Sequence, residues 1–379
     1  MIEYCFLLVV FLLLYIVECA VWVPVGAIAF RVAFNPKRRI TLLTKLAAQP
    51  SPGIVFAIPF SLRSDVIVCP LFPLSISPSG IASCSRLDDT NATGKFVAFE
   101  DIVRLEWEQN ALLVNGSAVA KCSEIQAVGL VDVLKRLKKL PIERRVAEIE
   151  KVLAQRFDPK GVEARVNELT EDTSNLSLDC LILPIMIFAV SPVVVWRWGL
   201  AASWPFVLAY LISNALLIAW DFRCADQDLF PAKGTTRWST IATILLSPPT
   251  AARAMKYLTR DIGSGHDPMA FAASRCSDAE FKRLASWMLR QSMFEPDTYR
   301  NADRRYEEST QWFRLKIQEH IVALVHAHGD NPEEIIAPNQ RESDRVESYC
   351  PRCLSQYVKS DGLCSDCGGV SLRPFDPSR

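Results

Sequence analysis

Four cysteines near the carboxyl end have the spacing of a metal site. Cys350 and Cys353 form one C-x-x-C pair, Cys364 and Cys367 form a second, and ten residues separate the pairs. Each pair can aim two thiolates at one point, and the arm brings the second pair opposite the first. Four thiolates at about 2.3 Å from one ion give the closed tetrahedral shell of structural zinc. The spacing therefore predicts structural Zn²⁺ bound by these four residues, with iron or a labile dithiol pair as alternatives.

The cysteine-rich tail resembles the zinc-ribbon family over residues 349–372. The motifs YCPRC and CSDCGG carry this resemblance, and the two glycines suit a tight turn where amides approach the sulfurs. A unit of about 25 residues cannot bury enough apolar surface to fold alone, so a bound metal would replace the missing core. Metal-binding thiols must stay reduced, which predicts a tail in the reducing cytoplasm.

The tail is not expected to bind nucleic acid. Six Arg or Lys and six Asp or Glu lie between Arg341 and Arg379, so the module is neutral. Nucleic-acid binding depends on phosphate contacts and therefore needs a positive surface. Docking of another protein, or self-association, is the expected role.

The sequence contains no recognisable catalytic motif. Four cysteines fill the metal shell, so no position stays open for a reactive water. The glycine-rich stretch at 263–265 lacks the Lys-Ser/Thr of a phosphate-binding loop. We therefore predict no catalytic and no cofactor-binding residue. The alternative is an enzyme whose site assembles from distant residues around His320, His328 and Asp330.

The composition is that of an ordinary soluble protein interrupted by membrane-like blocks. The 379 residues suffice for two or three compact units, and Lys plus Arg equals Asp plus Glu at 42 each. This balance gives no global bias toward polyanions. Half of the residues are apolar and collect in three blocks, which is typical of membrane spans. The eight cysteines outside the tail are scattered singly and are expected to be unpaired thiols.

The three apolar blocks predict three transmembrane helices. The block Tyr4–Phe30 has Glu18 as its only charge and predicts a span over 1–34, and its acidic start argues against a cleaved signal peptide. The second and third blocks predict a transmembrane helical hairpin over 178–220, because only a short turn separates them. Tryptophans at its tip and base suit the membrane interface.

Positive charge behind the first block predicts the orientation. The positive-inside rule places residues 35–177 in the cytoplasm and the N-terminus outside. The hairpin leaves and returns, so the C-terminus is cytoplasmic as well. The whole arrangement resembles a bacterial multi-pass protein of the cell membrane. The charges that set this orientation are Arg31, Lys37, Arg38, Arg39 and Lys45.

Segment 236–260 is predicted as an amphipathic element at the membrane interface. Pro248 and Pro249 interrupt its apolar run after about half a span. A crossing at this segment is the alternative, and it would place the tail outside.

Residues 53–140 predict a cytoplasmic β-rich domain with a C-terminal helix. Short runs of β-branched and aromatic residues alternate with turn residues, and Asn115-Gly116 predicts a type I′ hairpin. The stretches ISPSGI and GKFVAFEDIVRLEWEQNALLVNG resemble bacterial pleckstrin-homology-like (PH-like) domains over 75–140, which implies a binding or scaffolding module. A small β-sheet plus helix of no such family is the alternative. The helix and its continuation carry a basic outward face that could touch anionic headgroups: Lys135, Arg136, Lys138, Lys139, Arg144 and Arg145.

The sequence thus predicts a multi-domain membrane protein with helical spans, a small mostly-β domain, a helical region and a C-terminal zinc ribbon. Its expected function is that of a non-enzymatic membrane-anchored scaffold or regulator, with the lipid bilayer and a protein, or a second copy of itself, as partners. A membrane enzyme, or a transporter component that uses Glu18, is the alternative. The remaining predicted parts are a charged helix and linker at 141–177, a cytoplasmic helical region at 261–330 and a linker at 331–348.

Overall fold

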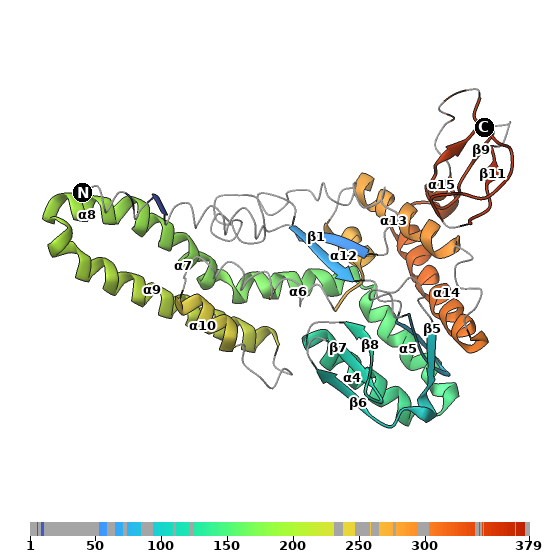
Figure 1. Cartoon of the computed structure of the whole chain (residues 1–379), viewed down its shortest axis with the longest axis horizontal. Coiled ribbons are helices and arrows are strands. Elements are labelled where there is room, and N and C mark those ends of the chain that lie inside the picture. The colour runs from blue at the N-terminus through green and yellow to red at the C-terminus, as the bar shows by residue number, and fades with distance from the viewer. Residues whose placement is uncertain are drawn as a thin grey trace. The chain divides into compact units, whose positions relative to one another are not determined.

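The computed structural model divides into two compact units (Figure 1). The first contains residues 160–264, and the second contains 68–159 and 265–379. Strands β1 (Gly53–Ile58) and β2 (Asp65–Pro70) form a two-stranded sheet. The residues that the structure describes are 6, 9, 10, 53–58, 65–70, 74–84, 94–108, 111–121, 124–230, 238–246, 258, 265–275, 278–294, 303–337, 341, 343, 345–367 and 369–375.

The first unit contains a helical hairpin. Its first arm consists of α7 (Ser174–Ile185), a π-helical turn η2 (Met186–Val190) and α8 (Ser191–Trp198), and its second arm is α9 (Leu200–Leu229). Figure 1 shows the chain reversing between α8 and α9. Gly199 makes this reversal with a φ of +76°, a conformation that a side chain disfavours. Its N–H donates to the Val195 carbonyl at 2.8 Å, which ends α8. Helix α6 (Pro159–Asp172) precedes the hairpin, and α10 (Trp238–Leu246) packs on α9.

The π-helical turn has a local cause in Pro192. Proline has no N–H to donate and its ring crowds the carbonyl four residues earlier, so an ordinary α-helix cannot continue through it. A wider π turn just before the proline accommodates the ring. The Ser191 hydroxyl donates to the carbonyl of Ile187 at 2.6 Å and satisfies an acceptor there.

Helix α9 is long and apolar enough to cross a membrane, and it is the one such helix among the described residues. Its 30 residues have a stretch with a mean hydropathy of 1.6, of which only 22% is buried. The apolar helix Met186–Trp198 opposite is shorter. The predicted span 1–34 lies outside the described residues except for three positions, and so does most of 236–260 after Leu246. Exposed aromatic residues lie along the hairpin: Trp196, Trp198, Trp204, Phe206 and Trp220.

The second unit contains two small antiparallel sheets, which confirms the β character predicted for this region. The first has the order β3-β4-β5, and the second β6-β7-β8. A short 3₁₀ turn η1 (Phe99–Asp101) lies between them, and α4 (Glu124–Lys139) packs on β6 and β7. The strands are β3 (Ser75–Ser77), β4 (Gly80–Cys84), β5 (Gly94–Ala98), β6 (Leu105–Glu108), β7 (Ala111–Val114) and β8 (Ser117–Lys121).

The hairpin turn predicted at Asn115-Gly116 is confirmed. It joins β7 to β8, and both residues have a positive φ, 53° and 81°, as a type I′ turn requires. The Asn115 side chain also fixes the turn to the chain before β6. Its oxygen accepts from the N–H groups of Val103 and Arg104 at 2.8 and 3.0 Å, and its amide donates to the Asp101 carbonyl at 2.8 Å.

Arg145 departs from the prediction of a solvated basic face. It lies on α5 (Ile142–Arg156), and only 6% of it is exposed. Its guanidinium donates to the carbonyls of Leu137 and Leu140 and to that of Pro78, at 2.9 to 3.0 Å. The last carbonyls of α4 have no helical partner, so a buried cation is a suitable donor for them. The same group pairs with Glu100 at 3.0 Å, and hydrogen bonds from the backbone and from Arg145 lower the Glu100 pKa.

Helices from the carboxyl-terminal part complete the second unit, a packing that the sequence analysis did not predict. Helix α14 (Arg304–Ala327) packs on β3, β4 and α5. The Lys316 ammonium on α14 pairs with Glu150 on α5 at 2.9 Å. Around α14 lie α12 (Pro268–Arg275), α13 (Asp278–Met293) and α15 (Pro332–Ile336). Segments from both sides of the helical hairpin therefore share one compact unit.

Candidate metal centre

A three-stranded antiparallel sheet supports the cysteine-rich tail. Its order is β10-β9-β11, with β9 (Ser348–Tyr349) in the centre, β10 (Gln356–Tyr357) and β11 (Arg373–Pro374). Tyr349 is opposite Gln356 on one side and Arg373 on the other. The ring of Tyr349 packs on Phe375 at 5.0 Å between centroids. Such short strands hold the two cysteine turns side by side.

Each C-x-x-C pair lies on a tight turn closed by backbone hydrogen bonds. In the first turn the Leu354 N–H donates to the Cys350 carbonyl at 2.8 Å. In the second the Gly369 N–H donates to the Cys364 carbonyl at 3.2 Å, so this turn is one residue longer. Leu354 and Gly369 both have a positive φ, 64° and 102°. Glycine adopts that conformation freely, whereas leucine is strained in it.

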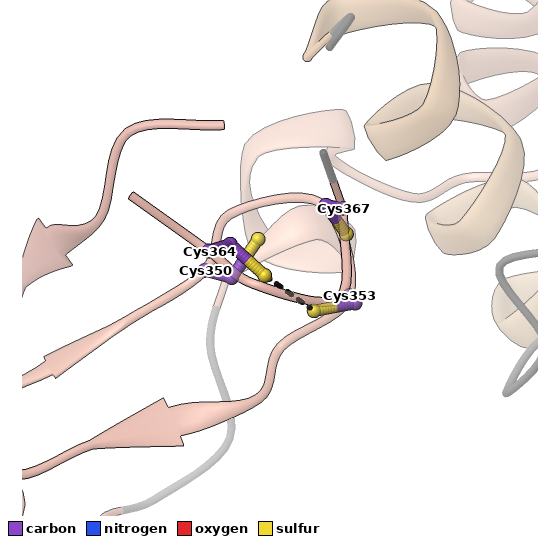
Figure 2. Close-up of side chains that lie close together, drawn as sticks. All are labelled: Cys350, Cys353, Cys364 and Cys367. Carbon is purple, nitrogen blue, oxygen red and sulfur yellow. Dashed lines mark hydrogen bonds between the residues drawn. The ribbon is translucent and has the colours of Figure 1, made fainter. Parts of the chain in front are cut away.

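The four sulfur atoms meet in one small space. Figure 2 shows side chains from both turns converging, with Cys353 and Cys364 in contact. All four sulfurs lie within 4.8 Å of one another, and Cys353 and Cys364 are 3.7 Å apart. Four ligands at about 2.3 Å from one tetrahedral ion lie about 3.8 Å from each other. A disulfide requires about 2.05 Å, and all four thiols are free. The cysteines therefore fit a metal ion with little movement.

The cluster is largely closed to water. Cys350, Cys364 and Cys367 are buried, and Cys353 is half-buried. Val370 is buried among them, and Phe294, Tyr357 and Leu372 pack around the cluster. A full shell of four thiolates inside an apolar cover is a structural metal site, because no coordination position remains for a substrate or water.

Two neighbouring hydroxyl groups lie within hydrogen-bond distance of the sulfurs. The Tyr357 hydroxyl lies 3.1 Å from the Cys364 sulfur, and the Ser355 hydroxyl lies 3.2 Å from the Cys353 sulfur. A hydrogen bond from the Cys350 thiol is the main cause that lowers the Cys353 pKa to about 4, and the same bond raises the Cys350 pKa. Burial raises the pKa of Cys367 to about 12. The lowered pKa favours the thiolate form of Cys353, which is the form that binds metal.

The structure does not bring His320 and His328 together as a second site. His320 stacks on Phe157 at 5.2 Å between centroids, and burial lowers its pKa. His328 stacks on Phe281 at 4.2 Å and pairs with Asp330 at 3.3 Å. The two rings thus have separate aromatic partners two helical turns apart.

Asp330 has a structural ion pair of its own. The Lys282 ammonium lies 2.7 Å from its carboxylate and lowers the Asp330 pKa. This pair joins α13 to the end of α14.

Sequence reasoning missed the side chains that surround the sulfurs. Tyr357 lies on β10 and Ser355 lies just before it. Phe294 follows α13, more than fifty residues before Cys350, the first cysteine of the quartet. An aromatic residue on the arm between the cysteine pairs was the one available signal for Tyr357. Nothing in the spacing of the chain pointed to Phe294.

Comparison with models of protein families, with curated protein sequences and with solved structures found no match to this chain. The four-cysteine cluster, consistent with a zinc ribbon, is therefore the feature on which any assignment of function depends.

Proposed function

We propose that this protein is a membrane-anchored, non-enzymatic scaffold or regulator whose aqueous part carries a structural zinc ribbon. The observation that carries the proposal is the convergence of the two C-x-x-C turns, with all four sulfurs within 4.8 Å. Cys350, Cys353, Cys364 and Cys367 are the proposed ligands. Zinc is favoured because four thiolates in tetrahedral geometry suit this ion, which needs no redox partner.

The membrane anchor is supported by the surface of the hairpin. Thirty helical residues extend about 45 Å, more than the roughly 30 Å of a bilayer core. Trp204, Phe206 and Trp220 on α9 are each more than half exposed, although large aromatic side chains normally avoid water. Lipid contact explains this arrangement, and tryptophans near the hairpin tip suit the interface. We propose three spans in all: residues 1–34 and the two arms of the hairpin 178–220.

Contacts within the second unit support a membrane orientation in which both flanks of the hairpin share one side. The Asp267 N–H donates to the Arg156 carbonyl at 2.7 Å, which joins residues beyond the hairpin to residues before it. Segments that form one unit cannot lie on opposite sides of a bilayer. The chain between them must therefore cross an even number of times, and the hairpin supplies two crossings. This parity favours an interfacial place for 236–260. The basic residues behind the first apolar block supply the absolute orientation that we propose, with the N-terminus outside and the C-terminus in the cytoplasm.

Protein docking is the role that we propose for the aqueous unit. Val358 and Leu363 of the ribbon are apolar and about two-thirds exposed. The β-rich part, 53–140, is proposed as a PH-like module that places the unit near the membrane surface. We propose no nucleic-acid partner, because the ribbon is neutral.

Metal analysis and partner capture on the full chain test this function. The chain purified in detergent under reducing conditions should contain one zinc per molecule, and Cys364→Ser should lose it. Cys224→Ser is the matched control, since that thiol lies on α9 and does not belong to the four-cysteine cluster. Any partner captured by the wild type and by Cys224→Ser, but not by Cys364→Ser, docks on the ribbon. A metal-free wild type, or catalytic turnover that survives Cys364→Ser, would refute the proposal.

A further inference from the structure

A buried arginine lies one helical turn before Phe294, a residue that packs against the cysteine quartet. Arg290 is in the last turn of α13, and only 7% of it is exposed. Burial lowers its pKa, while the sulfurs of Cys353 and Cys350 act on its charge in the opposite direction. Phe294, one turn later, packs directly against the quartet. A cation buried this deeply normally has a compensating anion, because an uncompensated buried charge is costly.

The hydrogen bonds of Arg290 leave part of its guanidinium without a partner. One terminal nitrogen donates to the Ser286 hydroxyl at 2.8 Å. Its Nε is buried and has no hydrogen-bond partner among the described residues. Arginine does not lose its proton in proteins, so the Nε–H of Arg290 remains a hydrogen-bond donor that needs an acceptor. Thiolate sulfur is an acceptor, and the quartet is the anionic group beside it.

The charge of a loaded metal centre matches this buried cation. Four thiolates outweigh one divalent ion by two negative charges, so the centre stays anionic when full. Groups around a metal shell that donate hydrogen bonds or positive charge to the ligands control how tightly the metal is held. A cationic donor close to Cys350 and Cys353 therefore offsets the negative charge of the loaded centre and helps to hold the metal.

A hydrogen-bonded path continues from Arg290 into the helices. Ser286 accepts from Arg290 and donates to the Ile335 carbonyl at 2.6 Å, at the end of α15. The guanidinium of Arg373 from β11 lies 4.7 Å from the ring centroid of Phe294. Helix α13 is thus joined to the ribbon on one side and to α15 on the other.

We infer that Arg290 is a positioning residue of the metal centre, a buried counter-charge that couples metal loading of the quartet to the packing of α13 on α15. The inference rests on the proposed zinc ribbon. It adds a regulatory consequence: loss of the ion, by chelation or thiol oxidation, loosens a helical part of the protein that contains no ligand. The metal state of the tail thereby affects α13 and α15, the helices that pack on α14.

Metal release from the full chain tests the inference. Arg290→Met keeps the length and removes the charge, and we expect zinc transfer to a chromogenic chelator to accelerate about tenfold or more. Arg290→Lys keeps a charge on a flexible stem and should recover part of the loss. Arg283→Met is the matched control, since Arg283 is exposed on the same helix, and its release rate should equal that of the wild type.

Cobalt provides a readout that a purely structural role would not change. With Co²⁺ in place of zinc, removal of the nearby cation raises the energy of the sulfur electrons. The sulfur-to-cobalt charge-transfer band of Arg290→Met should therefore move to longer wavelength, whereas those of Arg283→Met and Arg290→Lys should stay close to that of the wild type.

Hydrogen exchange on the wild type keeps the test decisive if Arg290→Met does not fold. Metal removal should speed exchange of the α13 and α15 amides, and Ser286→Ala should reduce that response at α15. The inference would be overturned if Arg290→Met released zinc at the wild-type rate and kept the wild-type cobalt band. It would also be overturned if metal removal left the hydrogen-exchange rates of the α13 amides unchanged. A wild type that holds no metal would instead refute the zinc ribbon itself, so the two failures are distinguishable.

Discussion

Ser309 on α14 and Ser77 on β3 share a buried hydrogen bond of 2.9 Å although 232 positions separate them. The helical hairpin lies between these two residues in the chain. Their contact places the strand made before the hairpin and the helix made after it in one core. Whatever the chain between Ser77 and Ser309 crosses, it must return to the side from which it left.

Cysteine labelling tests this topology directly. Arg197→Cys adds a thiol at the hairpin tip, and Lys359→Cys adds one on the exposed arm of the ribbon. In intact cells, a membrane-impermeant maleimide should label Arg197→Cys above the background of native thiols. It should reach Lys359→Cys only after the cells are permeabilised. Labelling of Lys359→Cys from outside would contradict both the orientation and the cytoplasmic ribbon.

Removal of the Tyr357 hydroxyl should weaken the metal centre without unfolding the ribbon. Tyr357→Phe keeps the ring that covers the quartet and removes the hydrogen bond to Cys364. A hydrogen bond to a charged group contributes about 1.5–3 kcal/mol, so we expect metal affinity to fall by a factor of about 10 to 100. Competition with a chelator of known affinity measures the change. Tyr349→Phe is the control, because its ring packs on Phe375, and an equal effect there would argue against a specific role for Tyr357.

Arg145 should be one of the most sensitive positions of the second unit. Arg145→Met leaves three carbonyl groups and Glu100 without their donor, which we expect to destabilise the unit by about 3 kcal/mol. Denaturant unfolding of the full chain in detergent measures this loss. The exposed neighbour Arg144→Met should change stability by no more than about 0.5 kcal/mol. Equal stabilities of the two variants would show that the buried guanidinium is dispensable.

Asp267 predicts a pH dependence of stability. It accepts from the Met269 N–H at 2.9 Å at the start of α12, and burial raises its pKa to about 6. A carboxyl whose pKa is higher in the folded state stabilises the fold when protonated. Stability is thus full below the ordinary value of 3.8 and is lost as the pH rises through about 6.

Asp267→Asn isolates this effect. The amide keeps an acceptor for Met269 and does not titrate, so the variant should be more stable than the wild type at neutral pH, by up to about 3 kcal/mol. Melting temperatures between about pH 4 and pH 7 should fall for the wild type and stay level for Asp267→Asn. A parallel fall in both proteins would assign the pH dependence to other groups. Asp361→Asn, at an exposed position of the ribbon, should behave like the wild type.

Local patterns predicted part of this structure, because their physics is local. The cysteine spacing placed four sulfurs together since a C-x-x-C turn has few conformations, and Asn115-Gly116 predicted its own turn since both residues tolerate a positive φ. The apolar composition of the chain likewise predicted the long apolar helix α9. Each of these features depends on residues within a few turns of one another.

Contacts between distant segments could not be predicted in the same way. Arg145 resembles its exposed neighbours along the helix, and its burial depends in part on Pro78 and Glu100, which are far away in sequence. The position of Arg290 near the sulfurs depends on how the end of α13 packs against the ribbon. No sequence pattern in either segment predicts that contact. A single sequence specifies such pairs only through the complete fold.

The bond between β3 and α14 also sets an order of events during synthesis. The ribosome releases the small sheets first, then both arms of the hairpin, and only later the helix that covers Ser77. Until α14 emerges, the β3-β4-β5 sheet lacks the helix that packs on it, and the second unit cannot complete its core. The second unit therefore completes its folding only after α14 has been synthesised. A nascent chain that stops before α14 has an incompletely packed core, which chaperones or proteases can recognise.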